Sequence, residues 1–220
     1  MDYEIFETKE RVLAENDAAA RSVRTYTREK GTFFVNLMAS PGAGKTTALL
    51  RLIERLGAEY PIAVMEADAD GDTDAAAIAE TGTKVIQLHT GGLCHMDADM
   101  TLRGLQRLGL DGVRLCFLEN VGNLVCPAEF DTGADLKMMI LSVPEGDDKP
   151  LKYPLMFQVS DLLVINKTDV SPIFDFDMAR LRRNVEPLHP GMPIFPVCAR
   201  TGEGFEALAD FLRERMEAGR

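Results

Sequence analysis

The 220-residue chain lacks an excess of basic charge, since aspartate and glutamate number 35, lysine and arginine number 24, and the formal net charge is −11. Nucleic-acid-binding proteins normally present a basic face, so this charge balance argues against that class. No apolar run approaches the roughly 20 residues that a membrane-spanning helix needs. The first residues are acidic, unlike the basic start of a signal peptide. We therefore expect a cytoplasmic protein that binds neither nucleic acid nor membrane.

Cysteines with disulfide-like spacing are missing as well. The four cysteines stand far apart in the sequence, and in a cytoplasmic chain such residues are more often core, metal-binding or redox residues. Cys116 falls within an apolar run and is interpreted as a core residue. The chain has no internal repeat and no low-complexity tract. We expect a polar helical lead-in over residues 1–30, lying across the surface of one α/β domain over residues 31–220.

The sequence is organised around the segment 39–47, which reads ASPGAGKTT. It follows the apolar run 33–38 and precedes the segment 48–56, whose apolar residues fit one face of a helix. A strand, a glycine-rich turn and Gly-Lys-Thr at a helix start define a phosphate-binding loop (P-loop), although Ala39 replaces its usual first glycine. Backbone N–H groups and the helix N-terminus of such a loop surround phosphate oxygens. The expected nucleotide-binding residues of the loop are Pro41, Gly42, Ala43, Gly44, Lys45, Thr46 and Thr47.

Two side chains of the P-loop have predicted roles at the phosphates. We expect Lys45 to reach the β- and γ-phosphates and the Thr46 hydroxyl to ligate Mg²⁺. Many GTPases carry Asp-x-x-Gly after a later strand, where the acid helps to hold Mg²⁺ and the glycine N–H contacts the γ-phosphate. Glu119 and Gly122 take these positions after the apolar run 113–118. We therefore assign Glu119 to Mg²⁺ and Gly122 to the nucleotide.

An acidic run follows the predicted strand 61–66 and offers further Mg²⁺ ligands. Carboxylates at the carboxyl end of a strand beside the first strand lie where an open α/β sheet holds Mg²⁺. Asp68 is the first candidate and Asp74 the second, and the rest of the run is interpreted as solvated loop. The predicted catalytic residues are Lys45, Glu119 and Asp68.

The segment Asn166-Lys167-Thr168-Asp169 follows the predicted strand 162–165 and indicates the base. Guanine presents two neighbouring donors that the Asp169 carboxylate can accept, whereas adenine offers no such pair. A buried unpaired polar group costs about 1–3 kcal/mol, so a site of this kind discriminates against adenine. Asn166 can contact the base edge, and the stem of Lys167 can lie over the ring. The segment predicts a guanine nucleotide.

Seven apolar runs alternate with helical segments along the chain, at 33–38, 61–66, 84–88, 113–118, 138–143, 162–165 and 194–197. The last run is followed by Cys198, Ala199 and Arg200, where GTPases often carry Ser-Ala-Lys and support the base with backbone N–H groups. We expect the same backbone contacts here. The alternation predicts a doubly wound, mainly parallel sheet that binds ligands at the carboxyl ends of its strands.

Cys94 and His95 lie together in the glycine-rich loop 89–97, and Cys126 lies in the loop 123–131. The second loop follows Gly122, in a region that changes shape with nucleotide state in GTPases. Thiolate and imidazole ligands suit Zn²⁺ and Ni²⁺, and three ligands leave the shell open or shared with a second subunit. The alternative is that these are structural cysteines and a hydrogen-bonded histidine.

Four runs of this sequence resemble the HypB family, the GTPases that assist nickel insertion into [NiFe] hydrogenases. The runs are Asn36–Thr47, Glu119–Asp131, Glu145–Leu155 and Val164–Asp169. The resemblance implies a SIMIBI-like three-layer P-loop GTPase that forms a homodimer, with Cys94, His95 and Cys126 as its nickel or zinc ligands. It also implies two partners, a nickel-binding accessory chaperone and the precursor of the hydrogenase large subunit. A cysteine-rich N-terminal motif and a histidine-rich tract, known in the family, do not occur here, so we expect no high-affinity nickel storage.

The favoured hypothesis is a slow GTPase metallochaperone that uses GTP, Mg²⁺ and Ni²⁺ or Zn²⁺ in hydrogenase maturation. One alternative is an accessory GTPase for another nickel or cobalamin enzyme, such as urease. A second is a small-molecule kinase with the same P-loop, against which the segment 166–169 argues because kinases usually bind adenine. A third is a nucleotide-gated binding module with negligible turnover.

Overall fold

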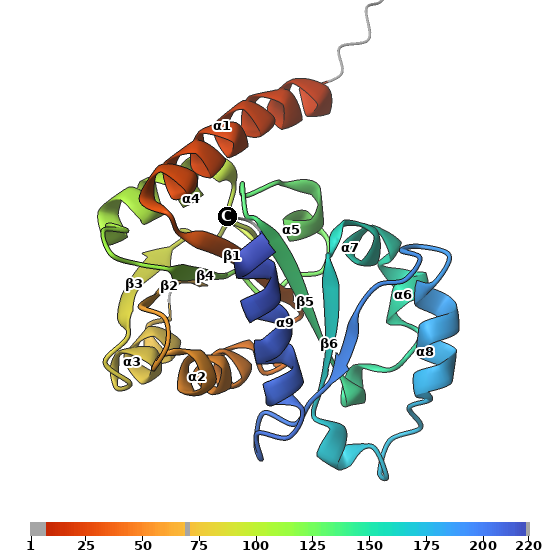
Figure 1. The fold of residues 1–220 in the computed structure, drawn as a ribbon. Helices are drawn as coiled ribbons and strands as arrows, with labels where there is room; N and C mark the ends of the chain where they lie inside the picture. The colour runs from red at the N-terminus through yellow and green to blue at the C-terminus, as the bar shows by residue number, and fades with distance from the viewer. Residues whose placement is uncertain (1–7, 69–70, 219–220) are drawn as a thin grey trace, which may run out of the picture.

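The computed structural model describes residues 8–68 and 71–218 of the chain, and its centre is a seven-stranded sheet (Figure 1). The strand order is β3-β2-β4-β1-β5-β6-β7, and every pair of neighbouring strands is parallel. The predicted doubly wound sheet is confirmed, and the described strands are parallel throughout. The strands are β1 Phe33–Ala39, β2 Ile62–Asp68, β3 Lys84–His89, β4 Leu115–Glu119, β5 Leu136–Ser142, β6 Leu162–Asn166 and β7 Ile194–Pro196.

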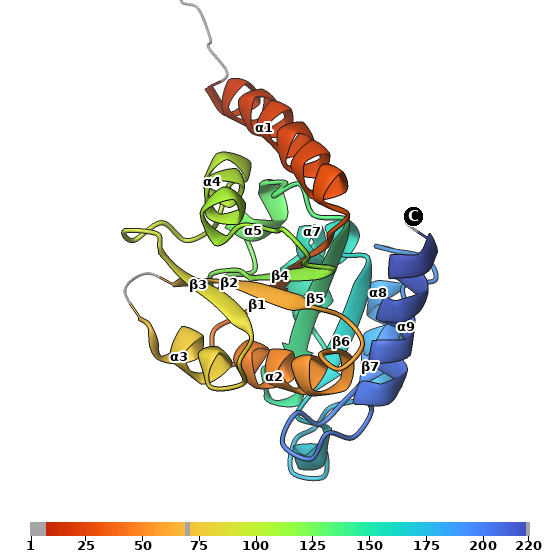
Figure 2. The same cartoon turned by 60° about the vertical axis from the view of Figure 1, so that its left-hand side comes forward.

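Helices cover both faces of the sheet and complete three layers (Figures 1 and 2). Side chains alternate along β1, so Val35 and Leu37 pack with α2, α3 and α9, whereas Phe34 and Met38 pack on the other face with α1, α4, α7 and α8. The helices are α1 Thr8–Lys30, α2 Lys45–Leu56, α3 Thr73–Ala79, α4 Ala98–Leu108, α5 Cys126–Glu129, α6 Lys149–Lys152, α7 Pro154–Val159, α8 Met178–Val185 and α9 Phe205–Ala218. None of the described helices is long and apolar enough to cross a membrane.

Helix α1 packs against α4 with its inner half, while its outer turns extend past the edge of the sheet (Figure 2). Ala20 and Val23 are buried in the core cluster beneath α1 and α4. Asn16 and Thr27 are buried as well, although the helix is otherwise polar. Over residues 8–30 the predicted helical lead-in is therefore a helix that adds side chains to the core, in addition to lying on the surface, whereas residues 1–7 of the prediction lie outside the described residues.

The strand order reverses beside β1, because β4 lies on one side of β1 and β5 on the other. In open α/β sheets, ligands bind beyond the carboxyl ends of the strands at such a reversal. The P-loop leaves β1 at this point and leads directly into α2. The fold thus places the phosphate-binding segment at the expected crevice.

Candidate nucleotide and metal sites

Two glycines shape the P-loop between β1 and α2. Gly42 and Gly44 have φ angles of 74° and 90°, a backbone region that favours glycine. A Cβ on Gly44 would lie 2.6 Å from Nδ2 of Asn166, so space excludes a side chain there as well. Asn166 donates from this Nδ2 to the Ala43 carbonyl at 3.0 Å, and Lys167 Nζ donates to the Gly42 carbonyl at 2.6 Å. The predicted base-recognition segment is therefore joined directly to the predicted phosphate loop.

The segment around Asp169 supports the predicted base site with side chains as well as backbone. The Ala199 N–H donates to Oδ1 of Asn166 at 3.0 Å. Cys198 Sγ lies 3.2 Å from one carboxylate oxygen of Asp169, and Arg200 Nε donates to the other at 3.0 Å. The Cys198 thiol and then the Arg200 guanidinium lower the pKa of Asp169, so the carboxylate is held ionised as an acceptor. The sequence had indicated a backbone contribution alone from Cys198 and Arg200.

Carboxylates from strands β2 and β4 and from the first turn of α3 gather beside the first residues of α2. The Thr46 hydroxyl donates to Oε1 of Glu119 at 2.8 Å. Glu66, Asp74 and Glu119 each offer an oxygen, and these oxygens lie within 4.8 Å of one another. Glu66 was missed because it falls inside an apolar strand pattern, whereas the pairing of β2 with β4 places it opposite Glu119. Asp68, the first predicted candidate, is outside this group of three and accepts a hydrogen bond from the Gly71 N–H.

The negative charges of the two buried glutamates in this group would be stabilised by a bound cation. Glu66 is 3% exposed and Glu119 is 1% exposed, and one oxygen of each has no hydrogen-bond partner among the described residues. Burial first, and then the neighbouring carboxylates, raise the pKa of each carboxyl to about 7, against the lowering effect of the groups that bond to it or lie near it. Hard oxygen donors beside a P-loop threonine suit Mg²⁺. The residues present therefore fit the cation that the P-loop implies.

The second candidate site is formed by Cys94 and His95, from the loop between β3 and α4, and by Cys126, which the sequence had placed in a loop and which is the first residue of α5. Their ligand atoms all lie within 4.8 Å of one another, and the two sulfur atoms are 3.0 Å apart. The His95 ring stacks on Phe130 with 4.1 Å between ring centroids, and burial lowers the pKa of His95, which favours the neutral, metal-binding imidazole. Cys94 is exposed, which is unlike a structural core cysteine. By contrast, Cys116 is fully buried in β4, as predicted.

A buried amide connects the two candidate sites. Asn120 lies between Glu119 and Gly122, and its Oδ1 accepts the Met96 N–H at 3.1 Å. Met96 is the residue after His95. Gly122 packs against the P-loop, where a Cβ on it would lie 3.0 Å from the Pro41 nitrogen. The segment predicted to sense the γ-phosphate therefore contacts both the P-loop and the loop of the metal cluster.

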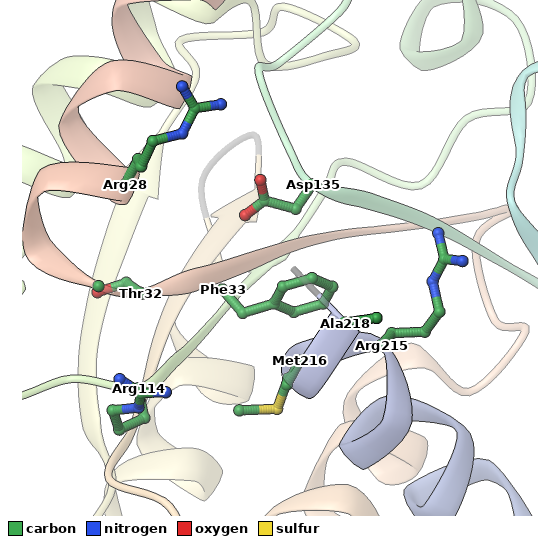
Figure 3. A pocket seen from close by; sticks show the side chains of 9 residues that line it. Arg28, Thr32, Phe33, Arg114, Asp135, Arg215, Met216 and Ala218 are labelled. Atoms are coloured by element: carbon green, nitrogen blue, oxygen red, sulfur yellow. The ribbon is translucent and has the colours of Figure 1, made fainter. Parts of the chain in front are cut away.

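A cavity of about 730 Å³ lies at the amino ends of the strands, at the opposite end of the sheet from the P-loop (Figure 3). Its walls include Phe33 from β1 and Met216 from α9. Three arginines also line it, Arg28, Arg114 and Arg215, but Figure 3 shows their side chains spread around the rim without converging. Because nucleotides bind at the carboxyl ends of parallel strands, this cavity is separate from the candidate nucleotide site.

The fold and the grouping of the P-loop, Glu119 and the segment 166–169 define a P-loop GTPase. A family model described as "CobW/HypB/UreG, nucleotide-binding domain" matches residues 33–196. The chain belongs to this family and, within it, to the HypB proteins.

Individual HypB proteins are similar to this protein over most of its length. The hydrogenase maturation factor HypB of Azotobacter chroococcum mcd 1 is 48% identical over 206 residues, which are 93% of this chain and 67% of the relative. The crystal structure of HypB from Helicobacter pylori in complex with nickel has a TM-score of 0.88 and 34% identity, covering 93% of this chain and 96% of the other. HypB from Archaeoglobus fulgidus has a TM-score of 0.86 and 38% identity, covering 93% and 100%.

Proposed function

We propose that this protein is a GTP-hydrolysing metallochaperone that delivers nickel during maturation of a [NiFe] hydrogenase. One observation carries the proposal: a cluster of two cysteines and a histidine is joined by a buried amide to the segment between Glu119 and Gly122. A metal-handling GTPase needs such a connection, because nucleotide hydrolysis must change the affinity of the protein for the metal. The names of the relatives, which are hydrogenase maturation factors, support the same target class.

Different residues of the chain bind the phosphates, the Mg²⁺ ion and the base of the nucleotide. The P-loop backbone and Lys45 bind the phosphates, and the Gly122 N–H contacts the γ-phosphate. Mg²⁺, when bound, neutralises charge on the phosphates, and Thr46 and Glu119 hold it with help from Glu66, Asp74 or Asp68. Asn166, Lys167 and Asp169 bind guanine, supported by the segment 198–200.

Slow turnover is part of this proposal. Efficient GTPases orient the attacking water with a glutamine or stabilise the transition state with an arginine. The segment 119–131, which begins at the last residue of β4, contains neither residue type. We therefore expect slow hydrolysis by the isolated protein, with release or transfer of the metal as its purpose.

The metal cluster also favours a homodimer. Leu93 is 52% exposed and Val125 is 50% exposed, and each is adjacent to a cysteine of the cluster. Exposed apolar side chains beside an incomplete metal shell suit the approach of a second copy, which would cover them and add ligands. Delivery then requires a nickel-binding accessory chaperone and the large-subunit precursor as partners.

The experiment that tests this function is a combined titration of the purified protein with nucleotide and nickel, with the mass of the particle measured in each state. We expect GTP and GDP to bind and ATP to fail at the same concentration, because adenine offers the Asp169 carboxylate no pair of donors. We also expect nickel, GTP or both to increase the dimer fraction. Equal binding of ATP would contradict the guanine site, and a monomer in every state would contradict the shared metal site.

A further inference from the structure

Asn16 is a buried amide in the middle of helix α1, with 8% of its surface exposed. Its Nδ2 donates to the backbone carbonyl of Asp131 at 2.9 Å. Its Oδ1 accepts the backbone N–H of Ala98 at 2.9 Å. One side chain therefore uses both of its polar ends to join α1 to two separate segments of the GTPase domain.

These two segments carry the metal cluster. Ala98 is the first residue of α4, three positions after His95. Asp131 directly follows Phe130, whose ring stacks on His95. The amide of Asn16 thus holds Ala98, at the end of the His95 loop, at a fixed distance from Asp131, the neighbour of Phe130.

Helix α1 also contacts the second segment, residues 131–133, through residues further along the helix. Arg24, two turns further along the helix, donates to Oδ2 of Asp131 at 2.6 Å. Gly133 has a φ of 80° and lies so close to α1 that a Cβ would be 2.5 Å from Cβ of Val23. The loop after Phe130 is therefore pressed against α1 and pinned to it by polar contacts.

We propose that Asn16 is a positioning residue for the metal cluster, although it touches none of the ligands. By holding Ala98 and the Asp131 carbonyl, it keeps the His95 loop and the Phe130 support in the arrangement that metal binding uses. A ligand set that is already ordered loses less conformational freedom on binding, so the affinity is higher. The inference rests on the proposed role of Cys94, His95 and Cys126 as metal ligands.

The test is the affinity of Asn16→Ala for Ni²⁺ and Zn²⁺, measured by competition with a chromophoric chelator. Loss of supporting contacts around metal ligands typically costs about 10–100-fold in affinity, and we expect about tenfold here. The Ni²⁺–thiolate absorption band should weaken or shift at equal occupancy, whereas GTP affinity should match that of the wild type. Asn184→Ala is the matched control, because Asn184 lies on α8 and its amide likewise donates to a backbone carbonyl, that of Asp147.

A second variant covers the case in which Asn16→Ala does not fold. Arg24→Gln removes the ion pair of α1 with Asp131, at a partly exposed site. We expect this variant to weaken metal binding about threefold. The effect is smaller than that of Asn16→Ala because only one of the two segments is released. Wild-type metal affinity in every folded variant of this pair would overturn the proposal, as would an equal loss in Asn184→Ala.

Cys94→Ala, measured alongside, separates this inference from the function on which it rests. If Cys94→Ala loses the metal while Asn16→Ala and Arg24→Gln retain it, the positioning role alone is wrong. If Cys94→Ala binds metal as the wild type does, the cluster is not the metal site, and the metallochaperone proposal fails with it.

Discussion

Replacing Lys45 by alanine is expected to lower kcat/KM for GTP hydrolysis by about 10²–10³-fold, the usual cost of removing one group that stabilises charge in the transition state. Lys45 is the first residue of α2 and follows the positive-φ glycine of the P-loop, where a lysine side chain can reach the β- and γ-phosphates. It belongs to none of the core clusters, so the free energy of unfolding should change little. Phosphate release under single-turnover conditions measures the effect.

Lys30→Ala is the control for that measurement. Lys30 forms an exposed ion pair with Asp111 at the far end of the sheet, and pairs of this kind contribute about 0–1 kcal/mol. We expect unchanged hydrolysis in this control. If Lys45→Ala kept wild-type turnover, the assignment of the P-loop to the phosphates would be wrong.

Replacing Cys94 by alanine is expected to weaken Ni²⁺ and Zn²⁺ binding by more than about 100-fold, since even supporting residues around metal ligands can cost that much. The loss removes one of two thiolates from a cluster of three ligands. Because thiols must release protons to bind metal, the wild-type affinity should also fall as the pH falls. Competition titration with a chelator at several pH values measures both effects.

Cys116→Ala is the matched control for the cysteine variant. It removes a thiol that is fully buried in β4, away from the cluster, so it should lower stability without changing metal affinity. Equal losses of metal in the two cysteine variants would mean that Cys94 acts through the fold and is not a ligand.

The architecture of the protein was predictable because it follows from local patterns. Each strand is a short apolar run, and buried parallel strands read in this way. Strand ends were predicted less well at acidic residues: β2 was expected to end at Glu66 but continues to Asp68, because β3 pairs with it as far as His89. The acidic residues had been interpreted as the start of a loop.

Contacts between distant segments could not be predicted from one sequence. Glu66 joins Glu119 only through the register of β2 on β4, which the sequence of either strand does not encode alone. The same holds for Asn16 and Asn120, whose amides connect segments from different parts of the chain. Both residues look like ordinary polar positions until their partners are placed beside them.

We propose that the metal cluster and the nucleotide site are coupled through the segment 119–126. Cys126 lies four residues after Gly122, and Asn120 bonds to the residue after His95, so a shift of this segment on GTP binding must move the ligands relative to one another. Coupling between sites typically changes affinity by about 5–150-fold, and the change is reciprocal. The most direct measurement is the Ni²⁺ affinity of the wild-type protein in the empty, GDP-bound and non-hydrolysable-GTP-bound states. We predict that the affinity differs between the two nucleotide states by at least about fivefold, and the same affinity in all three states would contradict the coupling.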